Sequence, residues 1–233
     1  MGKERGGMKL EQLAWWDLLI LTVLFFGPAI WSSFAAMRQP MLEMAGDTEF
    51  SGQENMGALV MQSLQLLLAM GYLYLRHFDF GQWHFAITWR ETLFAIGLFL
   101  VLGLAMDLIT NTLYGWEWVS DYLRSSVPLV GALSEVKISL VAYALLNGVF
   151  EELFFLGICT SLNPKYSVVL ILFAVLLRIS FHTYQGWGVA IGMGLVVGLT
   201  YYFSYTLFDA NLYPYMLSHA LADVLGLSLI HLL

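Results

Sequence analysis

The chain has 233 residues, of which 59% are hydrophobic and only 12% are charged, and its mean hydropathy is +0.73. Soluble domains carry about 25% charged residues, so this chain has too few polar side chains to cover an ordinary soluble globule. Its net charge of -7 gives no basic patch, which argues against nucleic acid as a partner. The single cysteine, Cys159, excludes an internal disulfide, and we expect it to pack in a helix.

Seven apolar runs are each close to the roughly 20 residues that a membrane-spanning helix needs. Alternating segments of about 10 residues, which would indicate a membrane β-barrel, do not recur. The sequence therefore predicts an all-α, polytopic membrane bundle of about seven transmembrane helices. The first run is too long for a signal peptide, so we expect it to remain in the protein. The predicted spans are 13–34, 56–75, 92–113, 138–159, 166–184, 189–207 and 215–232.

Two connecting segments are rich in aromatic residues. Residues 76–90 are expected to lie in the membrane interface, and residues 114–137 could form an amphipathic helix on its surface. Lys and Arg are more numerous in the segments that share a side with the N-terminus, which predicts a cytoplasmic N-terminus. We expect the membrane to be a prokaryotic plasma membrane. Asp17 is expected to be solvated, and Asp107 to lie at the surface.

The fourth span carries two adjacent carboxylates, Glu151 and Glu152, near its middle. A charge at that depth costs at least about 2.5 kcal/mol, so an intramembrane carboxylate indicates function. Nothing in apolar packing favours two glutamates side by side, and about 100° separates them around a helix. We therefore expect one to face a cavity and the other to face a neighbouring helix.

Two further pairs lie in the fifth and seventh spans, each with helical i, i+4 spacing: Arg178 with His182, and His219 with Asp223. A carboxylate and a histidine can activate water for hydrolysis, and a second histidine can donate to the developing oxyanion. Asp223 could orient His219. Each of these four residues, taken singly, could have a structural role instead. A histidine or aspartate can hydrogen-bond between helices, and an arginine can extend to the membrane interface.

The glutamate pair and these two pairs resemble the motifs of the CPBP intramembrane proteases, the family of CAAX proteases and bacteriocin-processing (Abi) enzymes. The family shows Glu-Glu-x-x-x-Arg, then Phe-x-x-x-His, then His-x-x-x-Asn or Asp, and the resemblance covers residues 138–232. It implies that Glu151 is the general base and His182 its partner on the water. It also implies that His219 and Asp223 form the oxyanion and orienting pair, without metal or cofactor, while Glu152 is supporting.

Three positions depart from the family motifs. Leu156 stands where the first motif has arginine, and Arg178 stands where the second has phenylalanine. We hypothesise that the arginine has changed helix, so that Arg178 neutralises a buried Glu152 and acts as a second supporting residue. Asp223 in place of asparagine is a poor oxyanion donor when ionised, so we expect it to orient His219.

The two histidines are expected at different depths, counting about 1.5 Å per residue from the nearest turns. A shared site therefore requires tilted, offset or broken helices. Gly157, Gly186 and Gly188 are the candidates for such breaks.

We expect one structural unit in which residues 1–137 form N-terminal transmembrane helices and residues 138–233 form a catalytic four-helix core. The predicted function is an intramembrane endopeptidase acting on a membrane-anchored or secreted precursor with a sorting tail, a bacteriocin-like sequence or a prenylated C-terminus. The alternatives are a proton-coupled carrier, for which no inverted repeat is found, and a non-catalytic immunity protein. A metalloprotease is a variant of the endopeptidase prediction, with zinc bound by Glu151, His182 and His219, although the sequence has no His-Glu-x-x-His motif.

Overall fold

The computed structural model describes residues 12–36, 52–115, 137–208 and 210–226, and in these ranges the protein is all-α, as predicted. Six helical stretches of the described residues are long and apolar enough to cross a membrane. A shorter helix over Tyr213–Leu225 brings the number of helices to about seven. The chain is an integral membrane protein. The main helices are α1 (Trp15–Ala36), α2 (Gly52–Leu75), α3 (Trp89–Tyr114), α6 (Ile138–Glu152), α7 (Ser167–His182), α8 (Trp187–Gly192), α9 (Gly198–Leu207) and α10 (Tyr213–Leu225).

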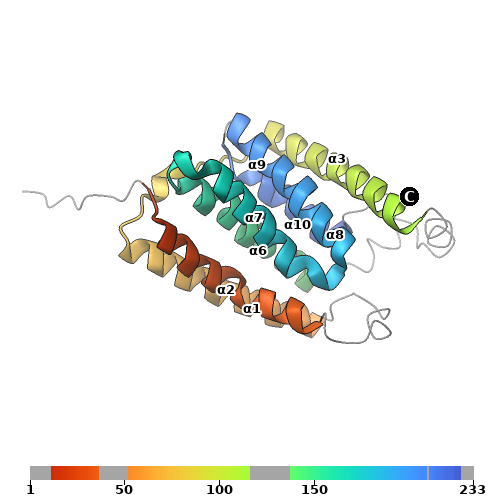
Figure 1. The fold of residues 1–233 in the computed structure, drawn as a ribbon, viewed down its shortest axis with the longest axis horizontal. Helices are drawn as coiled ribbons and strands as arrows, with labels where there is room; N and C mark the ends of the chain where they lie inside the picture. The colour runs from red at the N-terminus through yellow and green to blue at the C-terminus, as the bar shows by residue number, and fades with distance from the viewer. Residues whose placement is uncertain (1–11, 37–51, 116–136, 209, 227–233) are drawn as a thin grey trace, which may run out of the picture.

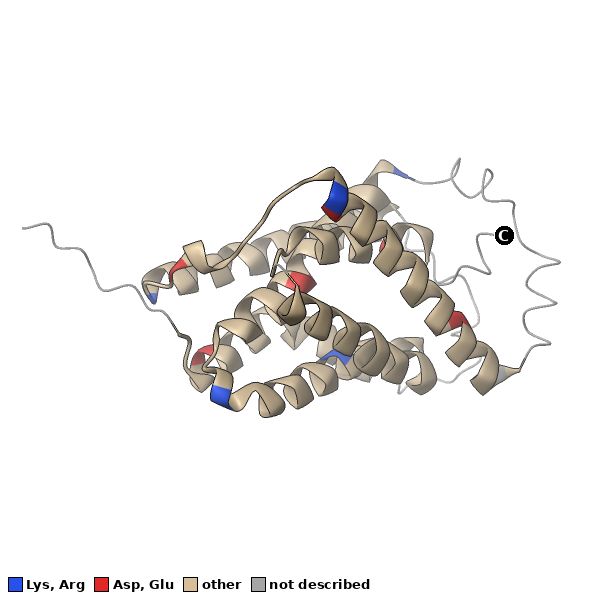
Figure 2. Ribbon diagram, turned by 90° about the horizontal axis from the view of Figure 1, so that it is seen from above, with Lys and Arg blue, Asp and Glu red and all other residues tan. Residues whose placement is uncertain are grey.

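The helices lie in three rows (Figure 1). Helices α1 and α2 form one side, α6 and α7 lie in the middle, and α3 with α8, α9 and α10 forms the other side. Phenylalanines join the first two rows, for example Phe26 of α1 stacked on Phe181 of α7 with ring centroids 4.7 Å apart. Charged residues are sparse along the helices (Figure 2), as a lipid-facing bundle requires.

The predicted seventh span, residues 215–232, corresponds only in part to α10. This helix has 13 residues in the described part of the chain. Its length is about 20 Å, which is less than the roughly 30 Å of a hydrocarbon core. It lies against α6 and α3, inside the bundle. Residues 227–233 lie outside the described residues, as does nearly all of the amphipathic helix expected over 114–137.

The fourth span is the central and most enclosed helix of the bundle. It runs over Ile138–Ser161, and 67% of its apolar window is buried. After α6 it continues as a π-helical segment, η3 (Leu153–Ile158), and a 3-10 turn, η4 (Cys159–Ser161). Single π-turns inside α-helices occur frequently at functional sites. This one starts directly after the glutamate pair and contains Gly157, one of the three predicted breaks.

A second irregularity separates the fifth and sixth spans. The 3-10 turn η6 (Thr183–Gln185) ends at Gly186, whose φ of 94° lies in the region that favours glycine. The sixth span then runs through α8, a π-helical segment η7 (Met193–Val197) and α9. Gly194 has no room for a Cβ, which would lie 2.5 Å from Ile179 Cγ1, so α7 and the sixth span are in direct contact.

Gly148 sets the distance between α6 and α10. A Cβ at this position would overlap the Met216 carbonyl oxygen and would lie 3.2 Å from the Ala220 backbone nitrogen. Both neighbours are backbone atoms of α10, so they cannot turn away as a side chain could. The absence of a Cβ thus lets α10 approach α6 next to Glu151 and Glu152.

We expect Gly148→Ala to destabilise the protein because α10 would have to move away from α6. Overpacking of this kind costs about 1–3 kcal/mol, and it should lower activity as well. Thermal unfolding in detergent measures the first effect. Gly97→Ala on α3 is the matched control, since a Cβ there meets nothing within 4 Å. Equal melting temperatures for the two variants would contradict this account of the contact.

Two expectations about acidic residues are wrong. Asp17 is fully buried, because the end of α2 and the residue after it contact the start of α1. The Arg76 Nε donates to Asp17 Oδ1 at 2.8 Å, and the Tyr72 hydroxyl donates to the same oxygen at 2.5 Å. Asp107 is also buried, at 7% exposure, because α3 packs against α10 and α8. In both cases tertiary packing covers a residue that its position along the span places near an end.

Candidate active site

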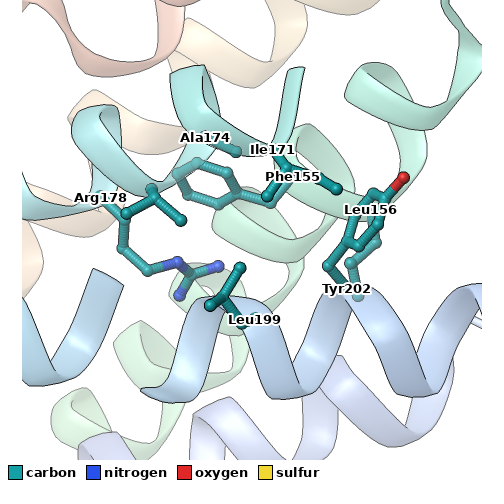
Figure 3. Close-up of a pocket in the computed structure, with 9 residues that line it drawn as sticks. Phe155, Leu156, Ile171, Ala174, Arg178, Leu199 and Tyr202 are labelled. Carbon is teal, nitrogen blue, oxygen red and sulfur yellow. The ribbon is translucent and has the colours of Figure 1, made fainter. Parts of the chain in front are cut away.

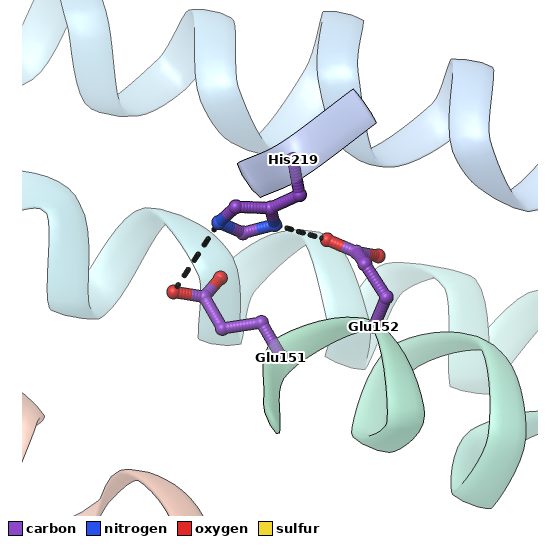
Figure 4. Close-up of side chains that lie close together, drawn as sticks. All are labelled: Glu151, Glu152 and His219. Carbon is purple, nitrogen blue, oxygen red and sulfur yellow. Dashed lines mark hydrogen bonds and ion pairs between the residues drawn. The ribbon is translucent and has the colours of Figure 1, made fainter. Parts of the chain in front are cut away.

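The centre of the site is His219 of α10, which lies between the two glutamates of α6 (Figure 4). Its Nδ1 is 2.6 Å from Glu152 Oε1, and its Nε2 is 3.9 Å from Glu151 Oε1. All three side chains are buried, with exposures of 6% or less. Because a carboxylate only accepts, Nδ1 is the protonated nitrogen, and Nε2 faces Glu151. The two glutamates therefore contact opposite sides of one imidazole ring.

Arg178 of α7 pairs with Glu152, which is the contact that the arginine hypothesis predicts. Its Nη2 donates to both carboxylate oxygens of Glu152, each at 3.0 Å. Its guanidinium also lies over the Phe155 ring, 4.1 Å from the centroid. A buried carboxylate requires such a partner, because desolvation of an unpaired ion costs several kcal/mol.

Leu156 and Arg178 line the same hollow between the fourth, fifth and sixth spans (Figure 3). It has about 310 Å³ of empty space, part of it open to the outside. Apolar side chains make up most of its wall, including Leu199 and the ring of Phe155. Position 156 and Arg178 thus border one hollow from different helical segments.

Asp223 lies in the site, but it is not the nearest orienting partner of His219. Its Oδ1 is 3.7 Å from His219 Nε2, whereas Glu152 lies 2.6 Å from Nδ1. Glu152 therefore orients the ring, since it makes the short hydrogen bond. Asp223 instead accepts a 2.8 Å hydrogen bond from the Asn147 amide. An orienting role for Asp223 stays a prediction, since its Oδ1 also lies within ion-pair distance of His219 Nε2.

Sequence reasoning missed Asn147, which the structure places in the site. It lies one turn before Glu151 on α6 and is 6% exposed. Its Nδ2 is 3.4 Å from Glu151 Oε1 and 3.3 Å from His219 Nε2. Its i, i+4 spacing to Glu151 was a usable signal, because residues four apart share a helix face.

His182 is buried near these groups but does not contact Glu151 directly. Its Nδ1 is 2.8 Å from the Arg178 carbonyl oxygen one turn earlier. A carbonyl only accepts, so Nδ1 carries the proton and Nε2 is the free acceptor. No hydrogen bond or ion pair joins His182 to Glu151 within the described part of the chain. A role for His182 on a shared water remains a prediction.

Three residues could offer ligand atoms to a metal ion: Glu151, Glu152 and His219, whose atoms lie within 4.8 Å of one another. This trio is not the predicted one, because it holds Glu152 in place of His182. The Arg178 guanidinium already occupies both oxygens of Glu152 and would repel a cation there. The donor set fits an ion pair with a histidine better than it fits a metal.

The residues that form this site lie in a region that matches a known protein family. Residues 134–225 match the family model described as type II CAAX prenyl endopeptidase Rce1-like. The C-terminal part of the chain is thus similar to this family, and the match covers less than half of the 233 residues. The Rce1-like region ends with α10 and contains all of the site residues named above. A search of curated proteins and a search of solved structures found no match.

The match confirms the resemblance to CPBP proteases and supports a membrane-embedded endopeptidase. Within the Rce1-like region the structure brings together five of the six predicted site residues through direct contacts: Glu151, Glu152, Arg178, His219 and Asp223. The sixth, His182, joins them through its hydrogen bond to Arg178. The buried glutamates and histidine are compatible with a water-activating protease.

Proposed function

We propose that the protein is a glutamate-type intramembrane endopeptidase in which Glu151 is the general base. The observation that carries this proposal is the difference between the two glutamates. Glu152 has both oxygens held by Arg178 and one by His219, whereas among the described residues Glu151 Oε2 has no hydrogen-bond partner and lies 3.7 Å from Arg178 Nη1. A carboxylate held less tightly than its neighbour is the better suited of the two to accept a proton.

The proposed reaction uses one water molecule. Glu151 takes a proton from the water while the water oxygen attacks the scissile carbonyl carbon. The carbonyl group then becomes a tetrahedral oxyanion. His219, oriented by Glu152, faces this centre with Nε2 and stabilises the charge when protonated. The intermediate collapses when the C–N bond breaks, and Glu151 passes the proton to the leaving amine.

The proposed substrate is the membrane-associated tail of a precursor: a sorting tail, a bacteriocin-like peptide or a prenylated C-terminus. Glu151 lies ten residues before the end of its helical stretch at Ser161, or about 15 Å along the axis. A bond cleaved at that depth belongs to a chain that is itself in or at the bilayer. The matched family is described as a CAAX prenyl endopeptidase, which makes the prenylated peptide the first one to test.

We further propose that the N-terminus is cytoplasmic in a prokaryotic plasma membrane. The bridges between Leu13 and Leu162 and between His84 and Asn211 join loops at one end of the bundle. Arg76, Arg90 and Lys165 flank these loops, and a surplus of basic residues favours the cytoplasmic side. The loops at this end include the one that precedes α10.

The proposal is tested with purified protein in lipid vesicles and matched peptides that differ only in prenylation. We expect one specific cleavage, located by mass spectrometry, and the same rate with and without a chelator such as EDTA. A rate that falls with EDTA and returns with added zinc would assign a metalloprotease. Absence of cleavage for prenylated, sorting-tail and bacteriocin-like peptides alike would remove the endopeptidase proposal.

The immunity-protein alternative loses its main support, which was the missing arginine at Leu156. Arg178 supplies that charge to Glu152 from α7. No feature of the described residues specifically favours a carrier.

A further inference from the structure

Asn147 occupies a position that the proposed reaction leaves unexplained. Three atoms form a small triangle in the site: Asn147 Nδ2, Glu151 Oε1 and His219 Nε2. Its sides are 3.4 Å, 3.9 Å and 3.3 Å. An oxygen atom seated over such a triangle can be within hydrogen-bond distance of all three corners. The triangle thus marks a site for an oxygen that meets one carboxylate and two nitrogen atoms.

The orientation of the Asn147 amide follows from its neighbours. The atom that faces Asp223 Oδ2 at 2.8 Å and Glu151 Oε1 at 3.4 Å must be the NH₂, because an amide oxygen there would oppose two carboxylates. The amide oxygen consequently faces α2, where the Gln62 side chain donates to it at 2.6 Å. Gln62 and Asp223 therefore hold the amide from both ends.

One of the two N–H groups of Asn147 is committed to Asp223, and the other is directed to the triangle. Asp223 supplies only acceptors when ionised, so it cannot stabilise a negative oxygen itself. The Arg178 Nη2 and the His219 Nδ1 are both bound to Glu152. Asn147 is thus the neutral donor on the Oε1 side of Glu151.

We propose that Asn147 is the amide donor of the reaction centre, holding Asp223 with one N–H and the oxyanion of the tetrahedral intermediate with the other. This inference rests on the proposed endopeptidase function and adds a catalytic residue to it. A neutral amide suits the task because its orientation is set before the reaction, so no reorganisation is needed as charge develops.

The test replaces Asn147 with leucine, which has a similar shape but no donor. We expect kcat to fall about 10²-fold, as for one oxyanion donor, while KM changes less than threefold. Gln62→Ala should cause a smaller fall in kcat, because the amide is then held from one end only. Asn111→Ala on α3 is the matched control: Asn111 is 2% exposed and its amide makes no hydrogen bond to the described part of the chain, so its removal should leave kcat unchanged.

A kcat of Asn147→Leu close to that of the wild type, or an equal fall for Asn111→Ala, would overturn the inference. A second measurement does not need activity: thermal unfolding of Asn147→Ala, Asp223→Ala and the double variant. We expect the two losses in melting temperature to be non-additive, since both variants break one hydrogen bond. Additive losses in melting temperature would overturn the inference about Asn147, whether or not the wild-type protein cleaves a peptide. A wild-type protein that cleaves no peptide would refute only the proposed function.

Discussion

Glu151→Gln is expected to lower kcat by about 10³-fold while the protein stays folded. Removal of a general base typically costs 10²–10⁴-fold, and glutamine cannot accept the proton of the attacking water. Glutamine has nearly the same shape and can still accept the Asn147 hydrogen bond at the position of Oε1, which measures 3.4 Å in the structure. The melting temperature should therefore change little. Cleavage of the best peptide, followed by mass spectrometry, gives the rate.

Glu91→Gln is the matched control for this variant. Glu91 lies in the first turn of α3, at the cytoplasmic end in the proposed orientation and away from the site residues. It should keep the wild-type rate. If Glu151→Gln cleaved as fast as Glu91→Gln, Glu151 would not be the base. Glu152 could not readily replace it, because both of its oxygens bind Arg178.

Arg178→Leu is expected to lower the melting temperature by on the order of 10 °C and to abolish cleavage. Breaking a buried ion pair on one side costs about 3–5 kcal/mol, because the remaining charge is left unpaired. Here the remaining charge is Glu152, which is fully buried and also orients His219. Both stability and activity should therefore fall together. Arg90→Leu, which removes an arginine at the exposed start of α3, should lower neither stability nor activity.

Leu156→Arg in the Arg178→Leu background is expected to recover part of both losses. Positions 156 and 178 line one hollow, so we expect a guanidinium from position 156 of η3 to extend toward the region that the native one occupies. Recovery need not be complete, because the contact of Arg178 with the Phe155 ring is specific to its own helix. A double variant as unstable as Arg178→Leu would show that the two positions are not interchangeable.

The spans and the glutamate pair could be predicted from the sequence because both are local properties. A run of apolar residues has to cross a membrane whatever its neighbours are, so predicted boundaries such as 138–159 agree with the helical stretch Ile138–Ser161 to within two residues. Adjacent charges inside such a run need a counter-charge, and Arg178 was the basic residue deep enough in another span. That reasoning uses the charge of each residue and its depth in the membrane, but it does not use which helix faces come into contact.

The contacts of Asp223 and Asn147, and the burial of Asp17 and Asp107, were decided by the tertiary structure alone. Each depends on which faces come into contact, and a sequence without its packing does not contain that information. Gly148 illustrates the reason: its missing Cβ allows α10 to lie close against α6, and this approach places His219 between the two glutamates. The sequence by itself determined which chemical groups lie inside the membrane, and the helix contacts decided which of them touch.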